Sequence, residues 1–432
     1  MGPKVIIQLL ASAITGVLVF FILTLSARLF GPEILGQAAY FTGILGLIFA
    51  FTDLGLSRAH IHFTAVKAGE PEVATFLSLK LPLLFLAAIV AGVISRVQSL
   101  PLVFIVLLLV EIFSRIADSI LISFEGQERA WPQNLLGIAV KCLRLVAVII
   151  FGWRLTTVLG YSLTFFIEAA ALFIGALVLG RHWFKFRPTR ESVRRYVRYG
   201  LPFAVIIPLS YLQDNSLILM LKHWRGATEL GIFTASFGLF GFLKTFSSSL
   251  MTFFFPRISR LHQKADFVKI QAYTDMAVKL LVWILVPVLG LLLALSSWLV
   301  PLILGPEFAA AVGIFRWYLL GIFVLAVFAP YDHVLFATSN QRSVMGVNLI
   351  STVILLFLGW WLIPAWGGQG AAVTSVSVWL ISGVWQFMVL RQKTGINFLH
   401  DWRLSGEEVK YLYGLFHSFS QAVIRSGRKK IS

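Results

Sequence analysis

Of the 432 residues, 58% are apolar and only 13% are charged, and the mean hydropathy is +0.87. An ordinary soluble domain carries about 25% charged residues, so this composition excludes a soluble protein and predicts an integral membrane protein. The net charge of +17 comes with no nucleic-acid-binding motif, and we expect no nucleic-acid partner.

Stretches of about twenty mostly apolar residues, the length of a membrane-spanning helix, recur along the whole chain. The first follows Lys4 and has no small-residue cleavage site behind it, so we expect a retained span and not a signal peptide. The sequence therefore predicts an all-α membrane protein with about twelve transmembrane helices. The predicted spans are 5–27, 37–57, 77–95, 101–123, 131–151, 155–180, 201–221, 230–255, 277–303, 311–337, 343–364 and 370–390.

The basic residues predict the orientation of these spans. The termini and the loops on their side of the membrane hold most of the 36 Lys and Arg residues. Because cytoplasmic loops carry an excess of Lys and Arg, we expect both termini in the cytoplasm and the protein in the cell membrane. The loops on the opposite side contain only Arg28, Arg96, Arg154, Lys222 and Arg225.

Two loops about 195 residues apart carry nearly the same sequence. Residues 29–36 read LFGPEILG, and residues 224–231 read WRGATELG. Each loop lies between the first and second spans of a six-span block, so the chain is expected to hold two copies of an ancestral half-transporter. The predicted domains are an N-terminal six-helix lobe at 1–180, a basic cytoplasmic linker at 181–200, a C-terminal six-helix lobe at 201–390 and a basic cytoplasmic tail at 391–432.

The linker and the tail are both basic. The linker holds seven Lys or Arg residues between Arg181 and Arg198, a cluster typical of a cytoplasmic segment in contact with anionic membrane lipids. In the tail, Ser405 and Glu408 form a capping box ahead of apolar residues at helical spacing, which predicts an amphipathic helix on the cytoplasmic leaflet. A polysaccharide polymerase or a glycosyltransferase is an alternative partner for this helix.

Charged residues inside predicted spans are expensive in lipid, so they are expected to face protein or a polar cavity. Cations in such a cavity would suit a phosphate-bearing substrate, because arginine and lysine bind phosphate oxygens. The alternative is an internal ion pair, which the spacing of Glu111, Arg115 and Asp118 on one helix face favours for Arg115. The candidate substrate-binding residues are Lys244, Lys141, Arg144, Arg115 and Arg316.

Carboxylates within the spans could bind and release a proton or Na⁺, which is how transporters couple to an ion gradient. We favour Asp214 or Asp332 for this role and a structural or gating role for Asp53. The candidate ion-coupling or gating residues are Asp214, Asp332, Asp53, Glu111 and Asp118.

The sequence contains no phosphate-cradling glycine loop, no zinc ligand set and no nucleophile motif. Its one cysteine, Cys142, lies in an apolar run and is expected to be a small buried apolar residue. We therefore predict no enzymatic activity, no cofactor and no metal site.

Several short motifs resemble the polysaccharide-export branch of the MOP superfamily, the Wzx-type flippases of lipid-linked oligosaccharides. They are residues 28–36, the Asp53-Leu54-Gly55-Leu56 segment, residues 212–215 and residues 304–308, and the resemblance covers roughly residues 5–390. It implies a MATE-like bundle of two six-helix lobes that alternates between inward-open and outward-open states.

The implied activity is transfer of a polyprenyl-pyrophosphate-linked oligosaccharide from the inner to the outer leaflet, for O-antigen, capsule or exopolysaccharide (surface polysaccharide or lipopolysaccharide) biosynthesis. Two alternatives are an ion-coupled MATE-like exporter of small molecules and a multispan polyprenyl-phosphate glycosyltransferase. The short outside loops argue against the glycosyltransferase.

Overall fold

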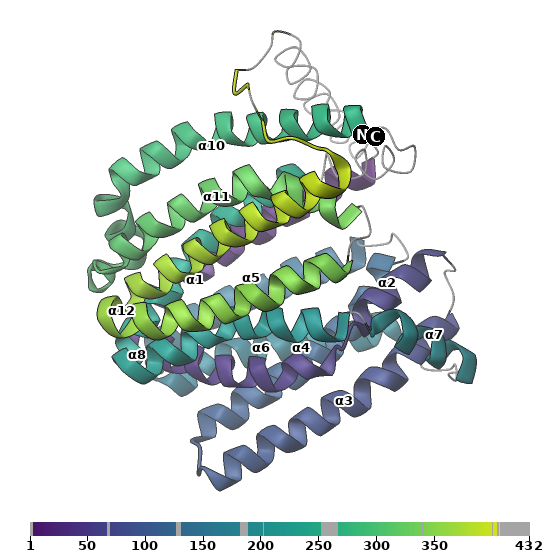
Figure 1. The fold of residues 1–432 in the computed structure, drawn as a ribbon. Helices are drawn as coiled ribbons and strands as arrows, with labels where there is room; N and C mark the ends of the chain where they lie inside the picture. Colours follow the sequence, from purple (N-terminus) through teal and green to yellow (C-terminus); the bar gives the residue numbers. More distant parts are fainter. Residues whose placement is uncertain are drawn as a thin grey trace, which may run out of the picture.

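The computed structural model describes residues 3–66, 70–126, 131–181, 189–201, 203–251, 267–337, 341–399, 401–403 and 406, and nearly all of them are helical. Figure 1 shows a bundle of long helices that lie roughly alongside one another. In chain order the α-helices are α1 (Pro3–Phe49), α2 (Leu56–Val66), α3 (Glu70–Val97), α4 (Leu102–Gly126), α5 (Trp131–Arg154), α6 (Val158–Gly180), α7 (Arg190–Gly200), α8 (Phe203–Met251), α10 (Phe267–Leu304), α11 (Ala311–Ala337) and α12 (Gln341–Thr394).

Eight helical segments among the described residues are long and apolar enough to cross a membrane. Large apolar side chains cover their outer surfaces: Phe85, Trp153 and Trp361 are 69%, 77% and 69% exposed. Such exposure is expected of surfaces that face lipid. The eight segments are Ala11–Thr52, Glu72–Val97, Trp131–Arg154, Val158–Gly180, Phe203–Thr245, Phe267–Leu304, Ala311–Asp332 and Met345–Thr394.

The three longest helices, α1, α8 and α12, each contain a glycine with non-helical backbone angles. Gly31 has φ 74° and ψ 171°, and Gly226 has φ 87° and ψ −175°. These two glycines belong to the repeated loops and share a conformation that only glycine adopts readily. The third, Gly367, divides α12, which runs out and back across the bundle in Figure 1. The repeat seen in the sequence is thus a repeat of backbone structure.

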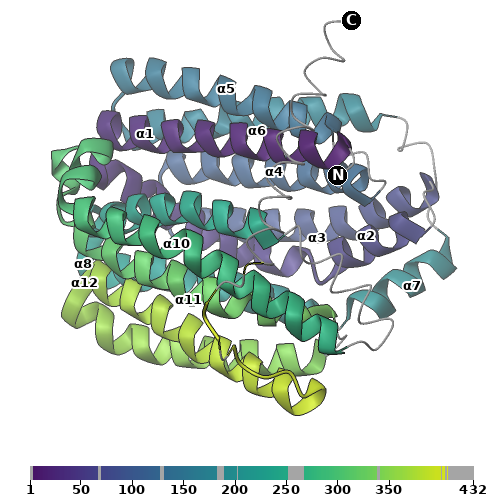
Figure 2. The same cartoon turned by 90° about the horizontal axis from the view of Figure 1, so that it is seen from above.

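The helices before and after α7 gather on different sides of the bundle. Figure 2 shows α1 and α3 to α6, coloured purple to blue, on one side, and α8 to α12, coloured teal to yellow, on the other. Within these groups α4 packs on α6, and α11 packs on α10 and α12. The two groups meet most extensively where α1 lies against α8.

Glycines make this meeting of α1 and α8 unusually close. A Cβ added at Gly36 would lie 1.8 Å from the carbonyl oxygen of Ala227, and one at Gly231 would lie 1.7 Å from that of Pro32. In the two repeated loops Gly36 corresponds to Gly231, and Pro32 corresponds to Ala227. The contact is therefore reciprocal, as in a two-fold symmetric interface. We call this contact the glycine seam.

The linker region contains a helix that the sequence did not predict. Helix α7 begins after Thr189, whose side-chain oxygen accepts a hydrogen bond from the backbone N–H of Ser192 at 3.3 Å. It packs on α2 and α3, through the buried Tyr196 and through Gly200, which lies against Gly55. Residues 189–200 of the linker therefore pack against the N-terminal helices.

The start of the predicted tail packs along the C-terminal helices. The Leu399 backbone N–H donates to the Tyr331 hydroxyl at 3.1 Å, and the indole N–H of Trp283 donates to the Trp402 carbonyl at 2.8 Å. Phe398 stacks on Tyr331. The predicted amphipathic helix after Ser405 lies almost wholly outside the described residues.

Candidate functional site

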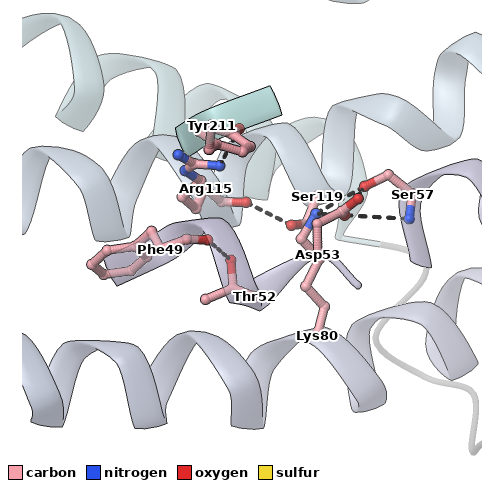
Figure 3. A network of polar contacts seen from close by, with 8 residues as sticks. All are labelled: Phe49, Thr52, Asp53, Ser57, Lys80, Arg115, Ser119 and Tyr211. Carbon is pink, nitrogen blue, oxygen red and sulfur yellow. Dashed lines mark hydrogen bonds and ion pairs between the residues drawn. The ribbon is translucent and has the colours of Figure 1, made fainter. Parts of the chain in front are cut away.

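A break between α1 and α2 brings together the first group of intramembrane charges. Leu54 and Gly55 have positive φ angles of 42° and 80°, so the chain turns sharply just after Asp53. The Asp53 carboxylate accepts a hydrogen bond from the backbone N–H of Ser57 at 3.3 Å and thereby caps the first turn of α2. Lys80 of α3 reaches the same carboxylate oxygen at 2.8 Å, as Figure 3 shows.

This Asp53–Lys80 pair is nearly enclosed. The two side chains are 10% and 9% exposed, and the Lys80 ammonium also donates to the Ser57 hydroxyl at 2.9 Å. A buried ion pair with its remaining hydrogen bonds satisfied is costly to break by removing one partner, because the other charge is left unpaired. Asp53 is therefore placed to hold the turn between α1 and α2 against α3.

Arg115 links the two groups of helices. Its Nε donates to Glu111 on the same helix at 3.0 Å, and its Nη1 donates to the Tyr211 hydroxyl of α8 at 2.6 Å. The guanidinium also lies 4.9 Å from the centre of the Tyr211 ring. Figure 3 shows Tyr211 against the Arg115 side chain, with Ser119 between Arg115 and the Asp53–Lys80 pair. Asp118, one turn further along α4, is exposed.

A second charged group joins α5 and α6. Arg144 donates to one Glu168 oxygen at 2.9 Å, and Lys141 donates to the other. The Arg144 guanidinium also lies 3.7 Å from the centre of the Phe165 ring, a cation–π contact. Its Nε is buried and has no hydrogen-bond partner among the described residues.

The remaining predicted site residues lie in the C-terminal helices, and two of them, Lys244 and Asp214, lie near each other. Arg316 of α11 donates to the hydroxyls of Ser296 and Ser297 of α10, both at 2.8 Å. Lys244 and Asp214 are both exposed and lie on opposite sides of the Gly226 kink of α8, close enough for the two charges to interact. Lys244 also sits 5.9 Å from the centre of the Phe240 ring. Asp332 has a buried carboxylate oxygen with no hydrogen-bond partner in the part of the chain that the structure describes.

Three contacts of the candidate site were not predicted from the sequence. Lys80 lies inside the predicted span 77–95 but is not among the site residues that the sequence predicts. Glu168 is 24 and 27 residues from its partners, so no local pattern could reveal that it neutralises Arg144 and Lys141. Tyr211 is uncharged and gave no signal. Of these, only Lys80 could have been found from sequence, because a lysine within an apolar stretch requires a partner.

The arrangement of these charges suits a phosphate-bearing ligand. Among the described residues, four cations of α3, α4 and α5 each pair with a carboxylate that could yield to a stronger anion. Arginine offers two parallel N–H donors, which match the oxygens of a phosphate. The site can therefore exchange an internal carboxylate or hydroxyl for a phosphate-bearing ligand.

Comparison with solved structures shows the class of protein that this fold defines. An inward-facing MATE family multidrug resistance transporter of the MOP superfamily superposes with a TM-score of 0.70, at 13% identity, over 88% of this chain and 94% of that one. The lipid II flippase MurJ in an inward closed conformation gives a TM-score of 0.68, at 12% identity, over 96% and 98%. The protein is a multi-pass membrane protein with the fold of the MOP superfamily, and it lies in the cell membrane.

Sequence comparison then gives the family. The family model described as "Polysaccharide biosynthesis protein" matches residues 25–313, well over half of the chain, and this protein belongs to that family. The model of the lipid II flippase MurJ matches residues 239–424. The lipid III flippase of Escherichia coli (strain K12) is 24% identical over 196 residues, which are 44% of this chain and 44% of that protein, so the match spans less than half of this relative.

Proposed function

We propose that this protein flips a polyprenyl-pyrophosphate-linked oligosaccharide from the inner to the outer leaflet for surface polysaccharide biosynthesis, as a transporter and not an enzyme. The observation that carries the proposal is the set of paired cations in α3, α4 and α5. Membership of the polysaccharide biosynthesis family and the similarity to two lipid-linked flippases support the substrate class. O-antigen, capsule and exopolysaccharide are the candidate products.

The proposed topology has twelve crossings. At about 1.5 Å per residue, helices of 47, 49 and 54 residues are roughly twice as long as the bilayer core or more, so each must turn back to stay within it. We count two crossings each for α1, α8 and α12, and one each for α3 to α6, α10 and α11. Helix α4, with 25 residues, is long enough to cross but carries three charges in its middle. An even count returns both termini to the cytoplasm.

We propose that residues 1–180 and 201–390 form the two lobes of an alternating-access transporter. Residues 181–200 then join the lobes, and residues 391–432 form the cytoplasmic tail, to which a polymerase or glycosyltransferase could dock. The glycine seam lies just past the kinks at Gly31 and Gly226, in the middle of α1 and α8, and this topology places it on the outer side. A closed seam there corresponds to an inward-facing state, and the similarity to an inward-facing transporter supports that assignment.

The pyrophosphate of the cargo would bind where the lobes meet. Arg115 is the first candidate, because it would exchange the Tyr211 hydroxyl for phosphate oxygens and so couple cargo binding to separation of the lobes. Lys141 and Arg144 are further candidates, since both could turn from Glu168 to a phosphate. We assign Lys244 and Arg316 of the C-terminal lobe to later contacts with the cargo.

Ion coupling is proposed for two carboxylates. Asp214 is exposed on α8, three residues from Tyr211, where a change in lobe contacts would alter its surroundings. Asp332 offers a buried carboxylate oxygen without a described partner, an arrangement suited to binding a proton or Na⁺. The same feature favours a second candidate function, an ion-coupled exporter of small molecules.

The test is made in cells deleted for the gene. Loss of surface polymer together with a polyprenyl-pyrophosphate oligosaccharide that accumulates on the cytoplasmic leaflet would support the flippase. A normal lipid-linked pool with intact polymer would instead favour the small-molecule exporter.

Complementation then tests the site. Lys141→Gln and Lys244→Gln are expected to restore less polymer than the parent at equal membrane levels. Lys141→Gln is a clean variant, because Arg144 still neutralises Glu168. Arg391→Gln removes the same charge from an exposed position at the end of α12 and is the matched control. Full restoration by both lysine variants would remove these residues from the proposed site.

A further inference from the structure

Helix α7 presents two opposite faces, and the residues that the structure describes cover only one of them. At about 100° per residue, Ser192, Tyr196 and Gly200 fall on one side of the helix, and all three are buried. The opposite side carries Arg190, Arg194 and Arg198 at intervals of four residues, and these three side chains are exposed. We call this opposite side the arginine face.

Apolar side chains extend the arginine face. Val197 is 50% exposed and Leu201 is 67% exposed, and both lie within the same sector of the helix as the arginines. Glu191 is at the edge of this sector, and Arg195, which pairs with Glu72, lies beyond it. The three arginines have no ion-pair partner among the described residues. Exposed valine and leucine side chains beside such arginines are unusual on a water-facing surface, whereas they are typical of a helix at a membrane interface.

The covered face is fixed rigidly to the N-terminal helices. The Tyr196 hydroxyl donates to the carbonyl of Glu72 at 3.1 Å and lies 3.0 Å from His60 Nδ1. Nε2 of His60 lies 2.8 Å from the Ser123 hydroxyl. Burial, helped by the positive charge of Lys80, lowers the pKa of His60 to about 3, so this histidine is neutral in the folded protein. The arginine face is therefore held in one orientation.

The position of α7 along the chain places this face at the membrane surface. Helix α6 ends at Gly180 and α8 begins at Phe203, and both of these helices belong to the candidate spans. Only two residues separate the end of α7 from α8, so α7 lies at the level where a span enters the bilayer. Figures 1 and 2 place α7 beside α2, at the opposite end of the bundle from the turn in α12.

We propose that the arginine face of α7 binds the anionic headgroups of phospholipids in the cytoplasmic leaflet, while Val197 and Leu201 enter the acyl boundary. This surface is distinct from the proposed cargo site, and it anchors one lobe of the protein to the membrane surface. Near an anionic surface each arginine contributes about fivefold to binding at moderate ionic strength. Three arginines on one face therefore select strongly for anionic over zwitterionic lipid.

The test measures which lipid lies next to α7 in the full-length protein. In a Cys142→Ser background, a fluorophore on Val197→Cys reports on its nearest lipids in reconstituted vesicles. Vesicles contain the same mole fraction of spin-labelled phosphatidylglycerol or spin-labelled phosphatidylcholine, and the ratio of quenching by the two lipids gives the local preference. We expect phosphatidylglycerol to quench several-fold more efficiently, and the ratio to fall as salt is added.

Two charge variants complete the test. Arg194→Gln with Arg198→Gln is expected to bring the quenching ratio down toward one, because the removed charges are those that favour the anionic lipid. Arg391→Gln with Arg403→Gln removes the same charge from exposed positions near the chain end and is expected to leave the ratio unchanged. Equal quenching by the two lipids in the parent, or an unchanged ratio in the α7 variant, would overturn the proposal. This readout does not depend on transport, so it stands or falls separately from the flippase activity.

Discussion

Replacing Gly36 with alanine is expected to prevent the glycine seam from closing. The new Cβ would lie 1.8 Å from the carbonyl oxygen of Ala227 and 2.7 Å from its carbonyl carbon. A carbon and an oxygen approach no closer than about 3.3 Å, so the two helix backbones would have to separate by more than about 1 Å. Both contacting groups are backbone atoms, so no flexible side chain can move aside.

The magnitude follows from the cost of overpacking. An extra methyl group in a close-packed contact costs about 1–3 kcal/mol. Here it destabilises only the state in which the seam is closed. A penalty of that size lowers the closed population by about 5- to 150-fold relative to the open one. Since an alternating-access cycle must pass through both states, transport is expected to slow while insertion into the membrane is unaffected.

The assay reports directly on the seam. Ala235 lies one helical turn from Gly231 and is 1% exposed. In a Cys142→Ser background, a cysteine introduced by Ala235→Cys is expected to resist a membrane-impermeant maleimide added from outside. The additional change Gly36→Ala is expected to make this cysteine reactive and to reduce export of the surface polymer.

Gly241 provides the matched control, because it lies on the same helix and a Cβ there would meet nothing within 4 Å. Gly241→Ala is expected to leave both labelling and export at parental levels. Parental labelling and export in Gly36→Ala, at normal membrane levels, would refute the assignment of the seam as a closed outer gate.

Two further predictions concern stability. Asp53→Asn is expected to destabilise the protein by about 3–5 kcal/mol, because Lys80 would remain buried without its counter-charge. The double change Asp53→Asn with Lys80→Met is expected to recover most of this loss. Equal melting temperatures for the single and double variants would contradict the prediction. The second prediction follows from His60, whose pKa is about 3 in the folded protein against 6.5 for the free side chain. Below pH 6.5 the unfolded chain takes up a proton that folded His60 does not, so stability should fall as the pH drops toward 3, by about 1.4 kcal/mol per unit. His60→Gln should reduce this slope in denaturation measured between pH 7 and pH 4, and an unchanged slope would show that His60 is not its source.

Much of the architecture was accessible from sequence because the bilayer imposes simple rules. The predicted span 101–123 corresponds to α4 at Leu102–Gly126, and 131–151 to α5 at Trp131–Arg154. Long apolar stretches must be helical in lipid, where every backbone polar group needs an internal partner. The repeated loops marked two of the three kinks in the long helices, since a glycine with positive φ has a local sequence signature.

The sequence did not reveal which charged side chains pair with one another. It gave the intramembrane charges of α4 to α6, and it correctly raised the pairing of Arg115 with Glu111, which are one helical turn apart. It left open whether Lys141 and Arg144 line a cavity or pair, and only the packing of α5 on α6 brings Glu168 to both. The role of Tyr211 likewise depends on how α8 lies against α4.

The sequence by itself determined that the protein is a helical membrane protein with a repeated glycine-containing loop, because hydrophobic length and local glycine signals do not depend on the rest of the fold. Tertiary structure decided which charges neutralise one another, where α7 docks and how closely α1 and α8 approach. Those features are set by the relative placement of helices far apart in the chain. That placement depends on side-chain packing summed over whole helix surfaces, and no local pattern of residues contains it.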